Sequence, residues 1–318
     1  MYVLLVVAIF LLLSAGPSSA VENHELKSLL NWVPKSSEVL LINVASHYLG
    51  VDENECEADI WIFRSLPTSL IYQLDGGKIE SRFRGKVVRH AVFATRNISH
   101  GALRGYLGGQ VILFENNLST EEISMIERCY FKHYKHEKYK VGIIKGNSTH
   151  LPQDHHLFIS VPEPNLLVIG LDQLFVEELL TNIQSRSKSD SCWNTLSITP
   201  DNAFVAYREY KKSSTDLWSP FTADGAFQKE FADPKARSIL MRFPGYSPKK
   251  VSLKYCGSPS GANAIATVLN HPFPIAKAIK KSDSYTDFEV CFSSKEESMI
   301  FALSVMGLFG HSMSGFDL

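Results

Sequence analysis

The chain has 318 residues, of which 45% are hydrophobic and 20% are charged, and its formal net charge is −1. This is ordinary globular composition, with enough apolar side chains to bury one large core or two smaller cores. A chain so close to neutrality has no long-range field to attract DNA or an anionic membrane, so composition argues against a nucleic-acid partner.

Residues 1–20 have the pattern of a secretion signal. Their continuous apolar run, residues 2–13, is shorter than the roughly 20 residues that cross a bilayer, and Gly16 and Pro17 follow it. We expect cleavage after Ala20 and a mature chain that is secreted or periplasmic, with no membrane span. An uncleaved membrane anchor is the alternative, because no Lys or Arg precedes the apolar run.

The first half of the chain alternates predicted strands and helices. The continuous apolar run 39–44 indicates a strand that is buried on both faces. Further strands are expected at residues 87–95, 109–114 and 141–144. A loop that contains Gly101, Gly105 and Gly108 is expected between the strands at 87–95 and 109–114. Ser119 or Thr120 can cap the next helix, with Glu122 where a capping box from Ser119 requires it, and we expect that helix to reach about His136.

The clearest structural signal is the stretch from Leu157 to Gln184. Two apolar runs, residues 157–161 and 166–171, flank the turn sequence Pro-Glu-Pro-Asn and predict a β-hairpin. Asp172 can then cap a helix whose apolar residues recur at helical spacing, namely Phe175, Val176, Leu179, Leu180 and Ile183. A hairpin followed by an amphipathic helix is typical of an α+β protein.

The polar stretch 184–191 is the best candidate linker, and we place a domain boundary there. The expected domains are an N-terminal α+β module, residues 21–187, and a C-terminal α+β module, residues 188–318. The second half repeats the order of the first, with predicted strands at 203–207, 238–243, 250–255 and 287–292 and predicted helices at 262–269 and 296–308. We therefore expect two similar modules that arose by internal duplication, mainly antiparallel sheets with packed helices.

Histidine offers the first candidate chemistry. His133 and His136 would share one face of the predicted helix, and Asp154, His155 and His156 follow in a polar loop. Imidazole and carboxylate ligands suit zinc, so these five residues form the candidate metal site. Against it, the H-E-x-x-H template is absent and lysines surround His133. Exposed surface histidines without a metal are the competing interpretation.

The other catalytic templates each lack a required residue. The sequence Gly310-His311-Ser312-Met313-Ser314 begins like a nucleophile elbow but has no closing glycine. Neither glycine-rich nucleotide-binding fingerprint is present, and the five cysteines are scattered without a C-x-x-C pair. We assign no catalytic residue and no cofactor, and the sequence leaves open whether the chain is an enzyme.

These observations favour a secreted or periplasmic, non-catalytic binding or structural protein with an unknown ligand or protein partner. The alternative is a metal-dependent extracellular hydrolase that uses the histidines between 133 and 156. Asn97, Asn117 and Asn147 fit the N-glycosylation pattern, lie in predicted loops or at element edges, and would carry sugar in a eukaryotic secretory pathway.

Overall fold

The structure is a computed structural model. It describes residues 24–48, 83, 85–100, 103–145, 156–185, 196, 198–199, 201–210, 237–244, 249–270, 276–294, 297 and 301. The predicted signal segment, residues 1–20, and the serine motif at 310–314 lie outside these ranges, as does most of the predicted linker. Among the residues that are described, no helix combines the length and the apolar character needed to cross a bilayer.

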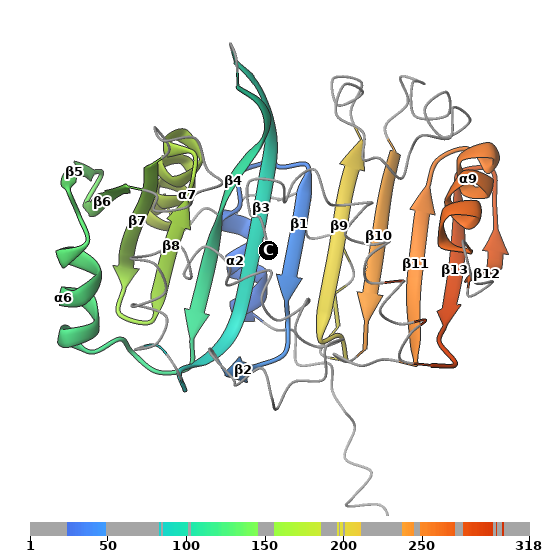
Figure 1. Cartoon of the computed structure of the whole chain (residues 1–318), viewed down its shortest axis with the longest axis horizontal. Coiled ribbons are helices and arrows are strands. Elements are labelled where there is room, and N and C mark those ends of the chain that lie inside the picture. Colours follow the sequence, from blue (N-terminus) through green and yellow to red (C-terminus); the bar gives the residue numbers. More distant parts are fainter. Residues whose placement is uncertain are drawn as a thin grey trace, which may run out of the picture.

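A single sheet of 13 strands organises the described chain (Figure 1), and every strand pair in it is antiparallel. The strands are β1 (Val39–Asn43), β2 (His47–Tyr48), β3 (Val87–His100), β4 (Leu103–Phe114), β5 (Lys132–His136), β6 (Tyr139–Lys145), β7 (His156–Glu163), β8 (Leu166–Gly170), β9 (Phe204–Tyr210), β10 (Arg237–Phe243), β11 (Lys250–Cys256), β12 (Ala276–Lys281) and β13 (Tyr285–Cys291). Their order is β12-β13-β11-β10-β9-β1-β3-β4-β8-β7-β6-β5, and β2 pairs with β3 off this path. The described helices are α2 (His24–Trp32), α6 (Thr120–Arg128), α7 (Gln173–Ser185) and α9 (Pro259–Leu269).

Strand β1 joins the two halves of the chain. Leu41 lies opposite Phe93 of β3 on one side and opposite Ala206 of β9 on the other. All five residues of β1 are buried, as the continuous apolar run predicts. The described chain combines helices with one large antiparallel sheet, as expected of an α+β protein, but the strands of both expected modules belong to one sheet rather than to two.

A separate hydrophobic core lies against each face of the sheet. Side chains alternate along a strand, so Val39 and Leu41 of β1 enter one core while Leu40 and Ile42 enter the other. The first core includes residues of α6 and α9, and the second includes residues of α2 and α7. Helices α2 and α7 also contact each other, and the Asn182 amide donates a hydrogen bond to the carbonyl of Trp32 at 2.9 Å. The sheet is thus covered by helices from both halves of the chain.

The hairpin and helix predicted between Leu157 and Gln184 are confirmed as β7, β8 and α7. The Asp172 carboxylate accepts the backbone N–H of Leu174 at 3.1 Å, which is the expected N-cap bond. All five apolar helix residues named above are buried. Burying side chains of this size stabilises the fold by about 1.5–3 kcal/mol each, as an upper bound, so this face fixes α7 on the sheet.

The second and third predicted strands, residues 87–95 and 109–114, are longer in the structure than the sequence indicates. Strands β3 and β4 form one hairpin whose pairing continues from Val88 opposite Phe114 to His100 opposite Leu103. The expected glycine loop is wrong, because Gly105 and Gly108 lie inside β4. Asn97 therefore lies within a strand rather than in a loop.

The helix expected to reach His136 ends at Arg128. Its start is as predicted, since Ser119 and Glu122 make both bonds of the capping box. Beyond it, residues 132–136 form β5, which pairs with β6 through a turn in which Glu137 has φ 53°. Lysine is a good helix former and is depleted in strands, so the pairing with β6 outweighs the local preference of this segment.

An ion pair holds the start of α7 to β3. Arg96 donates to the Asp172 carboxylate through Nε at 2.8 Å and through a terminal nitrogen at 2.6 Å. We expect Asp172→Ala to lower the free energy of unfolding by about 1–3 kcal/mol in urea denaturation, because it removes the N-cap acceptor and leaves a partly buried guanidinium without this partner.

Glu178→Gln is the matched control for that variant. Glu178 lies 3.7 Å from Arg96 and is 42% exposed, so its neutralisation should cost less than about 1 kcal/mol. Equal losses in the two variants would contradict the role given to Asp172.

Candidate functional site

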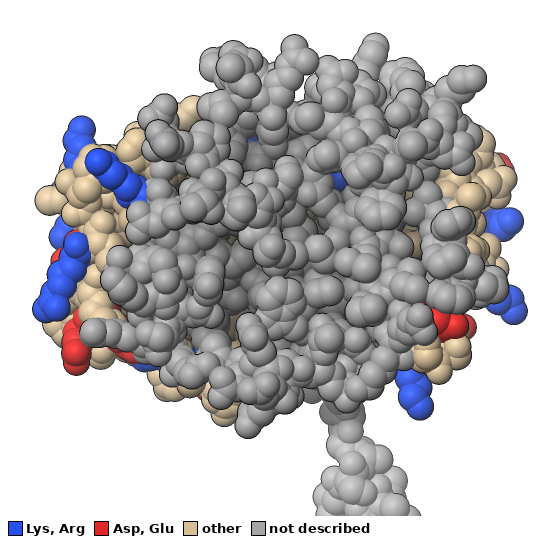
Figure 2. Space-filling model, viewed as in Figure 1, with Lys and Arg blue, Asp and Glu red and all other residues tan. Residues whose placement is uncertain are grey.

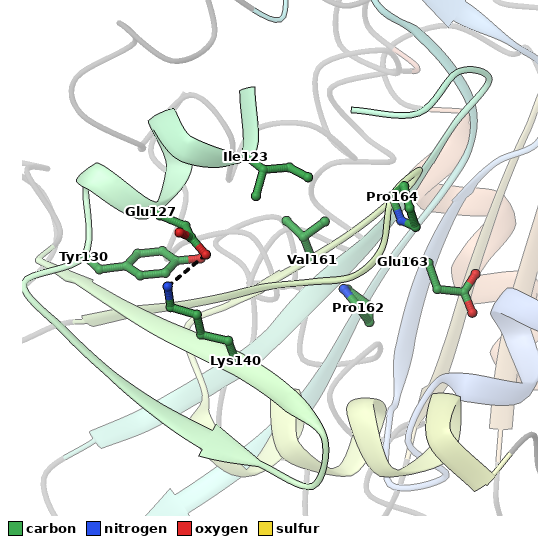
Figure 3. A pocket seen from close by; sticks show the side chains of 8 residues that line it. All are labelled: Ile123, Glu127, Tyr130, Lys140, Val161, Pro162, Glu163 and Pro164. Carbon is green, nitrogen blue, oxygen red and sulfur yellow. Dashed lines mark ion pairs between the residues drawn. The ribbon is translucent and has the colours of Figure 1, made fainter. Parts of the chain in front are cut away.

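A pocket lies between α6, β6 and the turn from β7 to β8 (Figure 3). Its volume is about 180 Å³, and we call it the Tyr130 pocket; it is lined by Ile123, Glu127, Tyr130, Lys140, Val161, Pro162, Glu163 and Pro164. One part of the wall is apolar, and one edge carries a carboxylate and an ammonium group. Pockets for drug-sized ligands usually measure about 300–1,000 Å³, so this one suits a single small group.

Helix periodicity on α6 and strand alternation on β6 explain why these side chains point into the pocket. Ile123 and Glu127 are four residues apart on α6, so they lie on one face of that helix. On β6, alternation places Tyr139 and Val141 in the core beneath α7 and directs Lys140 to the opposite face. The capping box at Ser119 fixes where α6 begins and therefore which of its residues face the sheet.

Tyr130 is held in place by the absence of a side chain on Gly142. A Cβ atom built on Gly142 would lie 2.1 Å from a ring carbon of Tyr130, so the ring occupies the space that a side chain would fill. Glycine in a strand often marks such a close approach, and an aromatic ring covers the backbone that glycine exposes. The ring is therefore a fixed wall of the pocket.

The hydroxyl of Tyr130 remains protonated at neutral pH. Burial of the side chain raises its pKa above the ordinary value of 10, and the nearby negative charge of Glu127 raises it further. The neutral phenol can donate one hydrogen bond as well as accept one. The pocket thus contains an uncharged aromatic wall with one polar tip.

An ion pair lies at the edge of the pocket. Lys140 Nζ is 2.9 Å from Glu127 Oε1, and it lies 5.7 Å from the centroid of the Tyr130 ring. The two charged side chains are 47% and 40% exposed. An ion pair this exposed contributes at most about 1 kcal/mol, so either charge can exchange its partner for a ligand group at small cost.

The structure separates His133 from His136. They lie on a strand and not on a helix, and residues three apart on a strand point to opposite faces. His133 is exposed opposite Gly142, whereas the His136 Nε2 atom is 3.0 Å from the Thr181 hydroxyl on α7. The expectation that these two histidines share a face is therefore wrong.

His156 is at the start of β7, where its ring centroid is 5.4 Å from that of Phe131. Asp154 and His155, the other two candidate ligands, lie outside the described residues. Within the described ranges, no three His, Cys, Asp or Glu side chains are grouped so that they could hold a metal ion. The five-residue metal site as a whole stays a prediction.

Sequence patterns did not point to the Tyr130 pocket. The turn around Pro162 and Pro164 is predictable from composition, and so is the start of α6. Nothing in the spacing places Tyr130 over Gly142, because that contact depends on the pairing of β5 with β6. A glycine inside the otherwise apolar run 141–144 was the one signal available.

No protein-family model matches the chain, and no curated protein matches it either. Among solved structures, the chain is similar to one described as crystal form I of TP0453, with a TM-score of 0.39 and 12% sequence identity. The match covers 87% of this chain and 96% of the other. A likeness at this TM-score supports no conclusion about fold or function.

The contact between Tyr130 and Gly142 can be tested by a double-mutant cycle. We expect Gly142→Ala to cost about 1–3 kcal/mol of unfolding free energy, because the added methyl group must displace the ring. In a Tyr130→Ala background the same substitution should cost less than about 1 kcal/mol, since the obstacle is gone. Additive effects in urea denaturation would show that the two residues are not in contact.

The raised pKa of Tyr130 predicts a pH effect on stability. Between about pH 10 and pH 12 the folded chain keeps this proton and the unfolded chain releases it, so stability falls as pH rises. Tyr130→Phe retains the ring and removes the ionisable group. Its free energy of unfolding should therefore fall less steeply over this range than that of the unmodified chain, and parallel curves would contradict the pKa shift.

Proposed function

We propose that the chain is an exported, non-catalytic binding protein whose Tyr130 pocket receives one side chain of a partner polypeptide. The observation that carries the proposal is the fixed aromatic wall, a ring seated on Gly142 beside apolar side chains of α6 and β7. Export rests on the sequence of residues 1–20, which has the order of a cleaved signal.

The size of the pocket supports a side chain as its occupant. A cavity of about 150 Å³ is known to hold a benzene ring, and the Tyr130 pocket has a volume of about 180 Å³. It therefore has room for the side chain of phenylalanine, leucine or methionine. Interfaces between polypeptides concentrate their binding energy in such small pockets, each filled by one anchor residue.

The chemistry of the wall also fits a peptide segment. Ile123, Val161, Pro162 and Pro164 offer apolar contact (Figure 3), and the prolines bring backbone that is already restricted. An aromatic anchor would meet the Tyr130 ring edge to face or in an offset stack. Beside the anchor, Glu127 can accept a backbone N–H, and Lys140 can donate to a backbone carbonyl.

We also propose that the two halves of the chain are related by duplication. In the first half, β1, β3 and β4 form a meander, α6 follows, and β8 later pairs with both β4 and β7. In the second half, β9, β10 and β11 form a meander, α9 follows, and β13 pairs with both β11 and β12. The leading strands β1 and β9 lie antiparallel at the centre, as halves related by a two-fold axis would place them.

Strands β5 and β6 have no counterpart among the described strands of the second half. The Tyr130 pocket is built on β6, so it lies where the two halves differ. A repeat that gains an extra hairpin beside its helix has acquired a surface that the common architecture does not need. This supports a binding role for the hairpin over a purely structural one.

Selection from a displayed random-peptide library tests the proposed function. Val161→Phe fills the pocket from β7, and Ile279→Phe makes a matched exposed change on β12, where Ile279 is 59% exposed. We expect enriched peptides to share one aromatic or large aliphatic residue and to bind Val161→Phe roughly tenfold more weakly. The Ile279→Phe control should bind them as the unmodified chain does.

Two outcomes would overturn the proposal. The first is equal binding of the enriched peptides to both variants, which would show that the pocket is not their site. The second is cleavage of peptides by the purified chain with near-stoichiometric zinc bound, which would support a metal-dependent hydrolase instead.

A further inference from the structure

Strand β5 is the last strand in the described sheet, so one of its edges faces away from its neighbour β6. Alternate residues of an edge strand direct their N–H and C=O groups away from the sheet, where they can pair with another extended chain. The pairing of β5 with β6 runs without a register shift from Lys132 opposite Ile143 to His136 opposite Tyr139. The edge is therefore regular enough for one more strand to pair with it through backbone hydrogen bonds.

This edge carries positive charge on both faces. We name it the basic edge: Lys132, Lys135 and Lys138 with the histidines between them. Residues 132–145 contain five lysines and a single carboxylate, Glu137. Lys132 and Lys135 are exposed and point to opposite faces of β5. Figure 2 shows lysine and arginine side chains gathered on the left flank, where β5 lies in Figure 1.

Among the described residues, the contacts that involve this edge leave most of its charge available. Glu137 accepts a hydrogen bond from the Gln184 amide, and Lys140 pairs with Glu127. Lys138 lies over the ring of Tyr139 at 5.1 Å, a contact that leaves its ammonium group charged. An acidic partner would thus meet positive charge along the length of β5.

We propose that the basic edge binds an acidic extended polypeptide segment, which adds to the sheet as a strand beside β5. Backbone hydrogen bonds supply the pairing, and carboxylates on both faces of the added strand pair with Lys132 and Lys135. This site is separate from the Tyr130 pocket and does not rest on the function proposed for that pocket.

A second copy of this chain fits the basic edge poorly. Two β5 strands would bring lysines together, and like charges directly opposite each other destabilise a strand pair. The strand at the far end of the sheet, β12, is also basic, with Lys277, Lys280 and Lys281 all exposed. Pairing of β5 with β12 would build an open filament, and charge repulsion opposes that as well.

Strand β12 is the weaker candidate for the same partner. Its pairing with β13 shifts register between Ala278 and Lys280, and a bulge of this kind interrupts the outward row of backbone groups. Strand β5 has no such interruption over its five residues. The acidic segment is therefore assigned to β5.

The test uses a blocked synthetic peptide of about ten residues in which valine and threonine alternate with glutamate. Binding is measured by fluorescence anisotropy at about 20 mM and about 200 mM salt, and strand addition by protection of the β5 amide protons from exchange. We expect saturable binding that weakens with salt, together with new protection of β5 amides. A peptide with lysine in place of glutamate should not bind, and a proline at the centre of the glutamate peptide should abolish binding.

Charge reversal locates the site on the chain. Lys132→Glu with Lys135→Glu should weaken binding of the glutamate peptide roughly tenfold. Lys27→Glu with Lys35→Glu makes the same change in net charge at exposed positions outside β5, on α2 and in the turn that follows it, and it should change affinity by less than about twofold. Equal effects of the two pairs would overturn the proposal, since only net charge would then matter.

Two further results would also overturn it. The first is peptide binding without protection of the β5 amides, because no strand would then be added. The second is binding to vesicles of phosphatidylcholine and phosphatidylserine that the Lys132→Glu, Lys135→Glu variant loses while its peptide binding is unchanged. That result would make an anionic lipid surface the partner of the basic edge.

Discussion

The described structure depends on the double pairing of β1. This strand of five buried residues makes antiparallel ladders with β3 and with β9, and it is the sole link along the sheet path between the described strands of the two halves. Its backbone groups are satisfied on both sides, and its side chains enter a separate core on each face. A polar side chain at Leu40 or Leu41 would therefore disturb one of the two cores while leaving the ladders in place.

The continuity of the sheet gives it two ends, and both carry lysine. An antiparallel sheet with an exposed, regular edge can pair with further copies, and natural proteins limit this with charge. The basic side chains of β5 and β12, the end strands of the described sheet, would oppose such pairing by charge repulsion. The same charge makes a regular edge selective, because it excludes basic strands and favours acidic ones. Protection from self-assembly and recognition of a partner then share one physical cause.

The Tyr130 pocket shows how a small site arises from backbone rather than from reactive groups. The ring rests where Gly142 has no Cβ atom, and the helix above it starts at a capping box that fixes which side chains face down. The charged pair at the edge is exposed and weak. This combination offers a shaped apolar surface with exchangeable polar contacts, which suits recognition of a polypeptide more than bond making.

The sequence alone determined the features that form through contacts a few residues apart. The caps at Ser119 and Asp172, the hairpin before α7, the buried face of that helix and the full burial of β1 follow from turn chemistry, local hydrogen bonds and apolar periodicity. Each of these signals lies within one or two elements, so a single sequence contains all the information that each requires.

The features that depend on long-range strand pairing were decided only by the tertiary structure. Residues 132–136 form a strand because β6 offers a ladder, and that choice places His133 and His136 on opposite faces. Two other contacts also join segments that no local sequence pattern predicts to be partners. They are the pairing of β1 with β9 and the packing of the Tyr130 ring on Gly142. Strand pairing is set by which edges are free and which faces can be buried together, and that is a property of the whole folded chain.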